Sequence, residues 1–217
     1  ILFRDWLGKK VKITAIDIDP VCKNHLQHQS QIEFVMGDQA NINFLKNLAK
    51  KHGPWDIILD DGGHTCNQVL TSFEILYPFV NENGVYLIED LNTHFWKEEF
   101  DDHPQKKTVK DLLLSSFEKM HDWTKVRSLY NYWHKPLNER TTDIPASNFC
   151  KTTGSVHCYD GVLVFEKLQR QEPYSEWRGA KGKEQKDLGC TPNYIANPYL
   201  RNFKQIIDKI KNKITKP

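Results

Sequence analysis

Apolar residues in the first ninety positions form short runs that alternate with helix-like segments. The runs have the four- or five-residue length of buried strands and lie at 12–16, 32–36, 55–59 and 85–88. Between them, apolar residues recur at a helical spacing, as at Ile42, Leu45 and Leu48. Helices are therefore predicted over 21–29, 41–51 and 65–80.

Turn-forming residues mark the boundaries of these elements. Pro20 is suited to the first turn of the helix over 21–29, and Gly53 to the end of the helix over 41–51. Asn83-Gly84 is predicted to be a turn that leads into the strand over 85–88. Strands joined by helices imply right-handed crossovers, so the pattern predicts an α/β fold with a doubly wound, mostly parallel sheet.

The second half of the chain is less regular. A helix is predicted over 108–120, where Thr108 and Asp111 have the spacing of a capping box. Asp160-Gly161 lies between two apolar runs and predicts a C-terminal antiparallel hairpin. Further predictions are a strand over 126–132, a loop over 170–198 and a basic surface helix over 199–213. The predicted domain covers 1–169, with a C-terminal extension over 170–217.

Composition narrows the class of protein. The chain has 217 residues, of which 39% are hydrophobic and 27% charged, and its formal net charge is +2. No apolar run approaches the ~20 residues of a membrane span, and the charge gives no support to nucleic-acid binding. Five scattered cysteines without a C-x-x-C pair favour a reduced, cytoplasmic protein.

Acidic residues follow every predicted strand of the first half. Parallel strands end at one edge of the sheet, where open α/β sheets bind ligands. Asp17 could accept the hydroxyls of a ribose, which we favour over a role in capping the next helix. Asp38 could accept a hydrogen bond from the exocyclic amine of an adenine or cap the helix at Asn41, and both readings stay open.

The densest acidic stretch is Asp60-Asp61-Gly62-Gly63-His64. The strand that ends there should neighbour the one closed by Glu89-Asp90, since one helix joins them. Asp61, Glu89 and Asp90 would then converge as a hard-cation site suited to Mg²⁺. The alternative is that these acids cap helices and pair with surface lysines. A nearby neutral His64 could act as a general base.

Four motifs occur in an order and spacing that are similar to those of a known family. The sequence resembles the class I S-adenosylmethionine-dependent methyltransferases and, more narrowly, the metal-dependent sugar O-methyltransferases of the macrocin and mycinamicin type. That group has D-D-G-S-H, and Gly63 replaces its serine here. The motifs are Ile16-Asp17-Ile18-Asp19-Pro20, Gly37-Asp38-Gln39, Asp60-Asp61-Gly62-Gly63-His64 and Leu87-Ile88-Glu89-Asp90-Leu91.

The resemblance implies a Rossmann-like fold and a role for each motif. Asp17 would bind the ribose of S-adenosylmethionine and Asp38 its adenine, with Gln39 and Asp60 in the same cofactor site. Asp61, Glu89 and Asp90 would bind Mg²⁺, and His64 would deprotonate the acceptor. The acceptor would be a sugar-containing small molecule, with no nucleic acid or membrane as partner; whether the chain forms a homo-oligomer stays open.

The sequence departs from the family pattern in one respect, and this departure leaves two alternative functions open. The family has a glycine-rich loop after its first strand, and nothing before Asp17 resembles it. We therefore expect that strand and loop to lie outside this sequence. A non-catalytic binding domain of the same fold is one alternative. A non-haem iron hydroxylase is another, but it needs two histidines, and only His64 lies in the acidic cluster.

Overall fold

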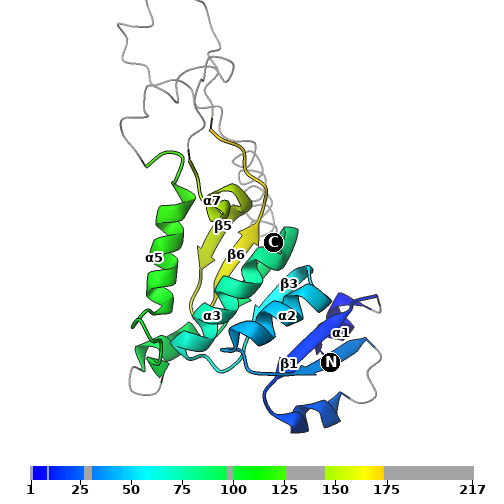
Figure 1. Ribbon diagram of the computed structural model, residues 1–217. Coiled ribbons are helices and arrows are strands. Elements are labelled where there is room, and N and C mark those ends of the chain that lie inside the picture. Colours follow the sequence, from blue (N-terminus) through cyan, green and yellow to red (C-terminus); the bar gives the residue numbers. More distant parts are fainter. Residues whose placement is uncertain (1, 9, 27–30, 97–99, 126–144, 174–217) are drawn as a thin grey trace, which may run out of the picture. The chain divides into compact units, whose positions relative to one another are not determined.

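The structure is a computed structural model of the chain (Figure 1). It describes residues 2–8, 10–26, 31–96, 100–125 and 145–173. The chain divides into two compact units, one of residues 1–120 and 148–170 and one of 121–147 and 171–217. All helices and strands given below belong to the first unit. The division into a domain over 1–169 and an extension over 170–217 stays a prediction.

Two parallel strands, β1 (Ile13–Asp17) and β2 (Ile32–Met36), form a small sheet after the short helix α1 (Leu2–Leu7). Ile13 lies opposite Ile32, and Asp17 lies opposite Met36. The helical stretch predicted over 21–29 is a short 3-10 helix where it is described, η1 (Pro20–His25), and it begins at Pro20. None of its residues is buried, so no packed apolar face supports a longer α-helix.

A second, four-stranded sheet has the order β3-β4-β6-β5. β3 and β4 are parallel, as predicted, while β6 runs antiparallel to both of its neighbours. The sheet is therefore mixed, and the predicted C-terminal hairpin is confirmed as β5 and β6. The bounds of the strands are β3 (Trp55–Asp60), β4 (Val80–Ile88), β5 (Thr153–Cys158) and β6 (Leu163–Lys167).

The predicted turn at Asn83-Gly84 is a bulge inside β4. Trp55 pairs with Val80 and Ile57 pairs with Val85, so the register shifts between the two pairs. Asn83 has a φ of 66°, in the left-handed region. The turn residues thus bend a continuous strand instead of preceding it.

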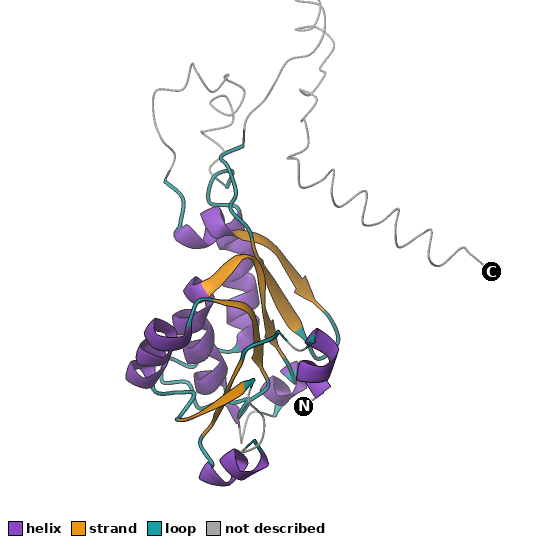
Figure 2. Cartoon of the chain, turned by 90° about the vertical axis from the view of Figure 1, so that its right-hand side faces the viewer, coloured by secondary structure: helices purple, strands orange, loops and turns teal. Residues whose placement is uncertain are grey.

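Helices α2 (Ile42–His52) and α3 (Cys66–Leu76) pack against each other, and a 3-10 helix, η2 (Tyr77–Phe79), follows α3 directly. Asn41 caps α2, and Gly53 ends it as predicted. After β4 come η3 (Leu91–Phe95), α5 (Val109–Met120) and α7 (Asn148–Thr152). At the start of α5, the predicted capping pair forms: Thr108 donates to Asp111 through its backbone N–H and its hydroxyl. Figure 2 shows the helices packed on the strands.

Aromatic rings from α3, η2 and the sheet form the centre of the core. The ring of Phe73 lies 4.9 Å from that of Tyr77 and 4.3 Å from that of Phe165. Tyr86 meets Phe73 edge to face, and the hydroxyl of Tyr77 hydrogen-bonds that of Thr153 at 2.9 Å. This cluster fixes α3, and the loop before it, against β4, β5 and β6.

Four strands, β1, β2, β3 and β5, each have one unpaired edge in the described part of the chain. β1 pairs only with β2, and β3 pairs only with β4. Ile16 on β1 and Ile57 on β3 are 37% and 45% exposed. Such edges can pair with a further strand.

Several predictions concern residues that the structure does not describe. These are the strand over 126–132, nearly all of the loop over 170–198 and the helix over 199–213. Within the described residues, no helix combines the length and apolar character needed to cross a membrane. Among the described residues, Cys22, Cys66, Cys150 and Cys158 form no disulfide.

Candidate functional site

Asp17 lies at the end of β1, where its carboxylate holds the following turn. One oxygen accepts a hydrogen bond from the backbone N–H of Asp19 at 2.8 Å, and the other accepts one from the Cys22 thiol at 3.3 Å. The backbone bond, followed by the thiol, lowers the pKa of Asp17. Asp19, rather than Asp17, caps the helix that begins at Pro20. The helix-capping alternative for Asp17 is therefore not realised.

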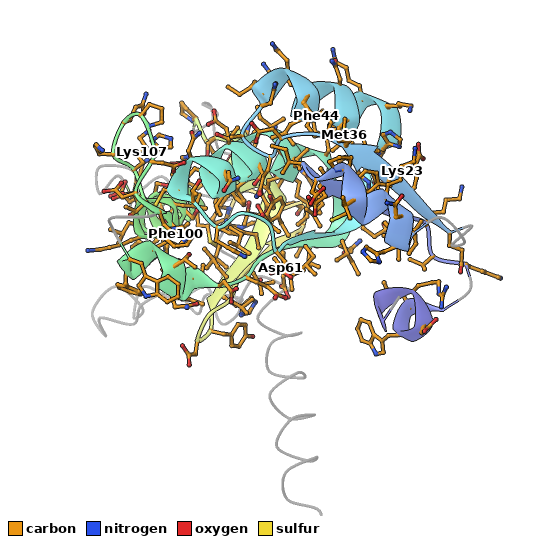
Figure 3. All side chains as sticks on the ribbon, turned by 90° about the horizontal axis from the view of Figure 1, so that it is seen from below. Lys23, Met36, Phe44, Asp61, Phe100 and Lys107 are labelled. Atoms are coloured by element: carbon orange, nitrogen blue, oxygen red, sulfur yellow. The ribbon has the colours of Figure 1, made fainter. Side chains whose placement is uncertain are left out.

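Asp38 occupies the turn between β2 and α2. Its carboxylate accepts a hydrogen bond from the N–H of Ala40 at 2.7 Å, while Asn41 is the residue that caps α2. Gly37, which precedes Asp38, lies directly against an aromatic ring of the protein itself. A Cβ added at Gly37 would lie 2.2 Å from the ring of Phe44, which is labelled in Figure 3.

Gln39 and Asp60 join the ends of β2 and β3. The amide nitrogen of Gln39 donates to the Asp60 carboxylate, and its amide oxygen accepts from the N–H of Gly63 at 3.1 Å. Asp60 also accepts hydrogen bonds from Ser72 and from Tyr86, the latter at 2.9 Å. Asp60 thus lies 7% exposed and faces the protein interior. Burial raises the pKa of its carboxyl, and the three hydrogen bonds oppose that rise.

The loop between β3 and α3 carries His64, the predicted general base, and Asp61, a predicted metal ligand. The capping box of Thr65 and Gln68 starts α3 at Cys66, so His64 lies just before the helix, as the predicted start at residue 65 implies. His64 has a φ of 57°, and Asp90 at the end of β4 has a φ of 53°. This left-handed conformation costs a non-glycine residue roughly 1–2 kcal/mol, so the surrounding contacts must hold both residues in place.

Asp61, His64 and Asp90 come together at the carboxyl ends of β3 and β4. His64 Nε2 lies 3.8 Å from a carboxylate oxygen of Asp61 and 3.7 Å from one of Asp90. One ligand atom from each residue can be chosen so that all three lie within 4.8 Å of one another. Both carboxylates are exposed, while His64 Nδ1 is buried without a hydrogen-bond partner.

Glu89 is not part of this group of three. Its backbone N–H donates to the carbonyl oxygen of Asp60 at 3.0 Å, which continues the pairing of β3 with β4. The predicted convergence thus holds for Asp61 and Asp90, and His64 joins them. Ligation of a metal by Glu89 stays a prediction, as do the other assigned roles.

The alternative roles of these acids in capping and lysine pairing are absent from the described structure. Asp90 precedes η3, yet its side chain makes no capping hydrogen bond. The ion pairs of Asp61 and Asp90 among the described residues are both with His64. Two exposed carboxylates therefore face one imidazole, a donor set in which oxygen ligands suit a hard divalent cation. The residues fit such an ion.

Sequence reasoning missed the residues that hold this site in place. Ser72 and Tyr86 satisfy Asp60 from the middle of α3 and β4, and Thr93 connects η3 to the carbonyl oxygen of His64. All three are buried. Ser72 and Tyr86 carry no distinctive signal in the sequence, because α3 and β4 hold several other polar residues and only burial sets these two apart.

Comparison with known proteins gives relatives of one kind, although no protein-family model matches the sequence. The chain is 44% identical over 84 residues to demethylmacrocin O-methyltransferase of Streptomyces fradiae. It is 40% identical over 79 residues to mycinamicin VI 2''-O-methyltransferase of Micromonospora griseorubida. These alignments cover 39% and 36% of this chain and 20% of each relative. The chain thus spans about a fifth of the length of these two curated relatives.

A longer alignment joins the chain to a tetracenomycin sugar methyltransferase of Streptomyces olivaceus. The relative is 8-demethyl-8-(2-methoxy-alpha-L-rhamnosyl)-tetracenomycin-C 3'-O-methyltransferase, 29% identical over 165 residues. The alignment covers 74% of this chain and 38% of the relative.

Solved structures of the MycE methyltransferase match the fold. One, in complex with Mg, SAH and mycinamycin VI, superposes with a TM-score of 0.58 at 28% identity and covers 80% of this chain and 40% of that one. Another, in complex with Mg and SAH, has a TM-score of 0.59. The chain therefore has the fold of a Rossmann-like methyltransferase, and its curated relatives are sugar O-methyltransferases.

Proposed function

We propose that this chain carries the metal and acid–base residues of a divalent-cation-dependent S-adenosylmethionine O-methyltransferase that acts on a hydroxyl of a sugar or glycosylated small molecule. One observation carries the proposal: Asp61, His64 and Asp90 meet within 4.8 Å at the ends of two adjacent parallel strands. The names of the relatives and the ligands in the MycE structures support it.

Each group in the proposed site has a distinct task. S-adenosylmethionine supplies the methyl group, and a divalent cation supplies positive charge that favours ionisation of the acceptor hydroxyl. Asp61 and Asp90 hold the cation, with Glu89 as the third predicted ligand. His64 Nε2, which faces the two carboxylates, accepts the proton of the hydroxyl. With the hydroxyl proton on His64 and the cation held by Asp61 and Asp90, the acceptor oxygen would be ready to take the methyl group that S-adenosylmethionine supplies.

The nucleoside is assigned to the neighbouring strand ends. Asp17 keeps lone pairs for the ribose hydroxyls despite its local hydrogen bonds, and Asp38 does so for the adenine amine. Gln39 and Asp60 complete the predicted cofactor site. Because both oxygens of Asp60 already accept hydrogen bonds from protein groups, we assign it an indirect part, through the placement of Gln39.

The two rival functions have less support. An iron hydroxylase site needs two histidines and a carboxylate, whereas the group of three holds one histidine and two carboxylates. A non-catalytic role gives no reason to hold two exposed carboxylates beside a histidine whose backbone has an unfavourable positive φ. Binding of S-adenosylhomocysteine without methyl transfer would nevertheless favour that alternative.

Metal dependence tests the proposal directly. Titration calorimetry with Mg²⁺ should give saturable binding to the wild-type chain, and Asp61→Asn should weaken it more than ~10-fold, or about 1.4 kcal/mol. Asp56→Asn is the matched control, because Asp56 is an exposed aspartate at the opposite end of β3. Equal affinity in the Asp61 and Asp56 variants would refute the site.

Methylation is followed with mycinamicin VI as the probe acceptor. Turnover should cease in excess chelator and return with Mg²⁺. Separately, Asp17→Ala should weaken the binding of S-adenosylhomocysteine by about 1–3 kcal/mol, because one charged hydrogen-bond partner is lost. Full turnover in the presence of chelator would exclude the metal from the reaction.

A further inference from the structure

Thr93 connects the two backbone segments that carry the proposed metal and base residues. It lies in η3, three residues after Asp90, and is 5% exposed. Its hydroxyl lies 2.8 Å from the carbonyl oxygen of Asp90 and 3.3 Å from that of His64. Its backbone N–H also donates to the Asp90 carbonyl at 3.1 Å. One buried hydroxyl therefore contacts two of the three residues of the site, His64 and Asp90, from inside the protein.

The two residues that it contacts both need support. His64 and Asp90 have positive φ angles of 57° and 53°, which non-glycine residues maintain only when their surroundings hold them. The pairing of β3 with β4 fixes the backbone as far as the N–H of Glu89. Beyond it, the Thr93 hydroxyl contacts the backbone of both the Asp90 turn and the His64 turn, and a side-chain contact of 3.2 Å between Cys66 and His94 joins the same two segments.

We propose that Thr93 is a positioning residue for the divalent-cation site. Its hydroxyl proton is shared between the two carbonyl oxygens, and this sets the distance between the His64 imidazole and the Asp90 carboxylate. Thr93 itself touches neither the cation nor the acceptor. The inference rests on the proposed function, since it assumes that Asp61 and Asp90 bind a cation.

If Thr93 had a purely structural role, its replacement would change the stability of the protein but not its affinity for the metal. The hydroxyl would then stabilise only the first turn of η3, and its loss would lower the stability of the protein without changing metal affinity. Metal affinity, and its rescue by a residue that keeps the hydroxyl, therefore separates the two roles. Residues behind a metal site typically change metal affinity by about 10–100-fold when they are replaced.

The experiment compares Thr93→Val with Thr93→Ser in the full chain. Valine keeps the shape of threonine without the hydroxyl, whereas serine keeps the hydroxyl without the methyl group. Binding of Mn²⁺ alone is followed by electron paramagnetic resonance, and unfolding by urea. Thr93→Val should raise the apparent Kd for Mn²⁺ by ~10–100-fold, and Thr93→Ser should stay close to wild type.

Thr153→Val is the matched control. Thr153 is fully buried, and its hydroxyl bonds to Tyr77 in the core, away from the carboxylates. This variant should be less stable than wild type and should bind Mn²⁺ unchanged. Should Thr93→Val fail to fold, Thr93→Cys replaces it, because a thiol is a weaker donor of similar size to serine.

Wild-type affinity in Thr93→Val would overturn the inference, and so would an equal loss in Thr93→Ser and Thr93→Val. These outcomes leave the proposed function intact, because the wild-type chain still binds Mn²⁺. A wild-type chain that binds no Mn²⁺ would overturn the metal site and this inference together.

Discussion

His64 must satisfy two requirements at one position. Its backbone has a φ of 57°, and its Nε2 lies within 4 Å of a carboxylate oxygen on each of Asp61 and Asp90. Asparagine tolerates the left-handed region better than most residues, but its amide cannot serve as a base. Replacing His64 by Asn therefore removes the proposed chemistry with little extra strain.

We expect His64→Asn to reduce turnover by ~10²–10⁴-fold, the range for loss of a general base. Binding of S-adenosylhomocysteine should be unchanged, since His64 is not assigned to the nucleoside. Turnover with mycinamicin VI and calorimetry measure the two effects, and His64→Gly, which fits the same φ, is the control for strain. Normal turnover would rule out His64 as the base, and loss of Mg²⁺ binding would make it a ligand.

The loop between β3 and α3 contains two glycines, and a different glutamine side chain packs against each of them. A Cβ at Gly62 would lie 2.1 Å from the amide oxygen of Gln39, and a Cβ at Gly63 would lie 2.2 Å from that of Gln68. Gln39 donates to the buried Asp60, whereas Gln68 completes the capping box of α3. Displacing Gln39 therefore removes a donor from a buried carboxylate.

Gly62→Ala should consequently destabilise the protein more than Gly63→Ala. A donor lost from a buried charged group costs about 1–3 kcal/mol, whereas loss of a helix cap typically costs ~1 kcal/mol. Urea unfolding gives both free energies. Adding Gln39→Ala removes the side chain that the new methyl group would meet, so Gly62→Ala should cost little in that background. A larger cost for Gly63→Ala would contradict this account.

The stability of the whole folded unit should fall in alkali because tyrosines are buried in its core. Burial raises the pKa of Tyr77 to about 12, against which the hydrogen bond with Thr153 acts. An unfolded tyrosine ionises near pH 10. Between pH 10 and 12 the folded chain therefore retains a proton that the unfolded chain releases, so stability falls as pH rises.

For Tyr77 alone, this loss should reach about 2–3 kcal/mol by pH 12. Tyr77→Phe should lower stability at pH 8, where its hydrogen bond is missing, but show a shallower decline above pH 10. Urea unfolding across this range measures both slopes. Tyr86 is also buried, and burial raises its pKa, so some decline should remain in the variant. Parallel slopes for wild type and variant would contradict the assignment.

Local patterns determined the elements of the first unit. The strand at Ile32–Met36 has the predicted bounds, and the helix that ends before Gly53 begins within one residue of its predicted start. Periodicity and turn residues act over a few positions, so they can be read without knowledge of the fold. The convergence of Asp61 and Asp90 was predictable for a related reason, because parallel strands end at one edge.

Tertiary structure alone decided where neighbouring side chains point. Asp60 and Asp61 are adjacent in the sequence, yet one is buried among Ser72 and Tyr86 and the other is exposed beside His64. Glu89 lies outside the group that its neighbour Asp90 joins. These outcomes depend on how segments some thirty residues apart pack together, which a local pattern does not encode.

The sequence by itself thus determined the order of strands and helices along the chain and the acidic edge, and it suggested the metal-binding chemistry proposed for that edge. The structure decided that the turn at Asn83 is a bulge, that the ring of Phe44 covers Gly37 and that a hydroxyl on η3 reaches the His64 carbonyl. It also left β1 and β3 with one unpaired edge each in the described chain. The physical reason is the distance along the chain over which each effect acts. Helix, strand and turn propensities act between residues close in the sequence, whereas side-chain contacts and strand register arise only when distant segments of the chain pack together.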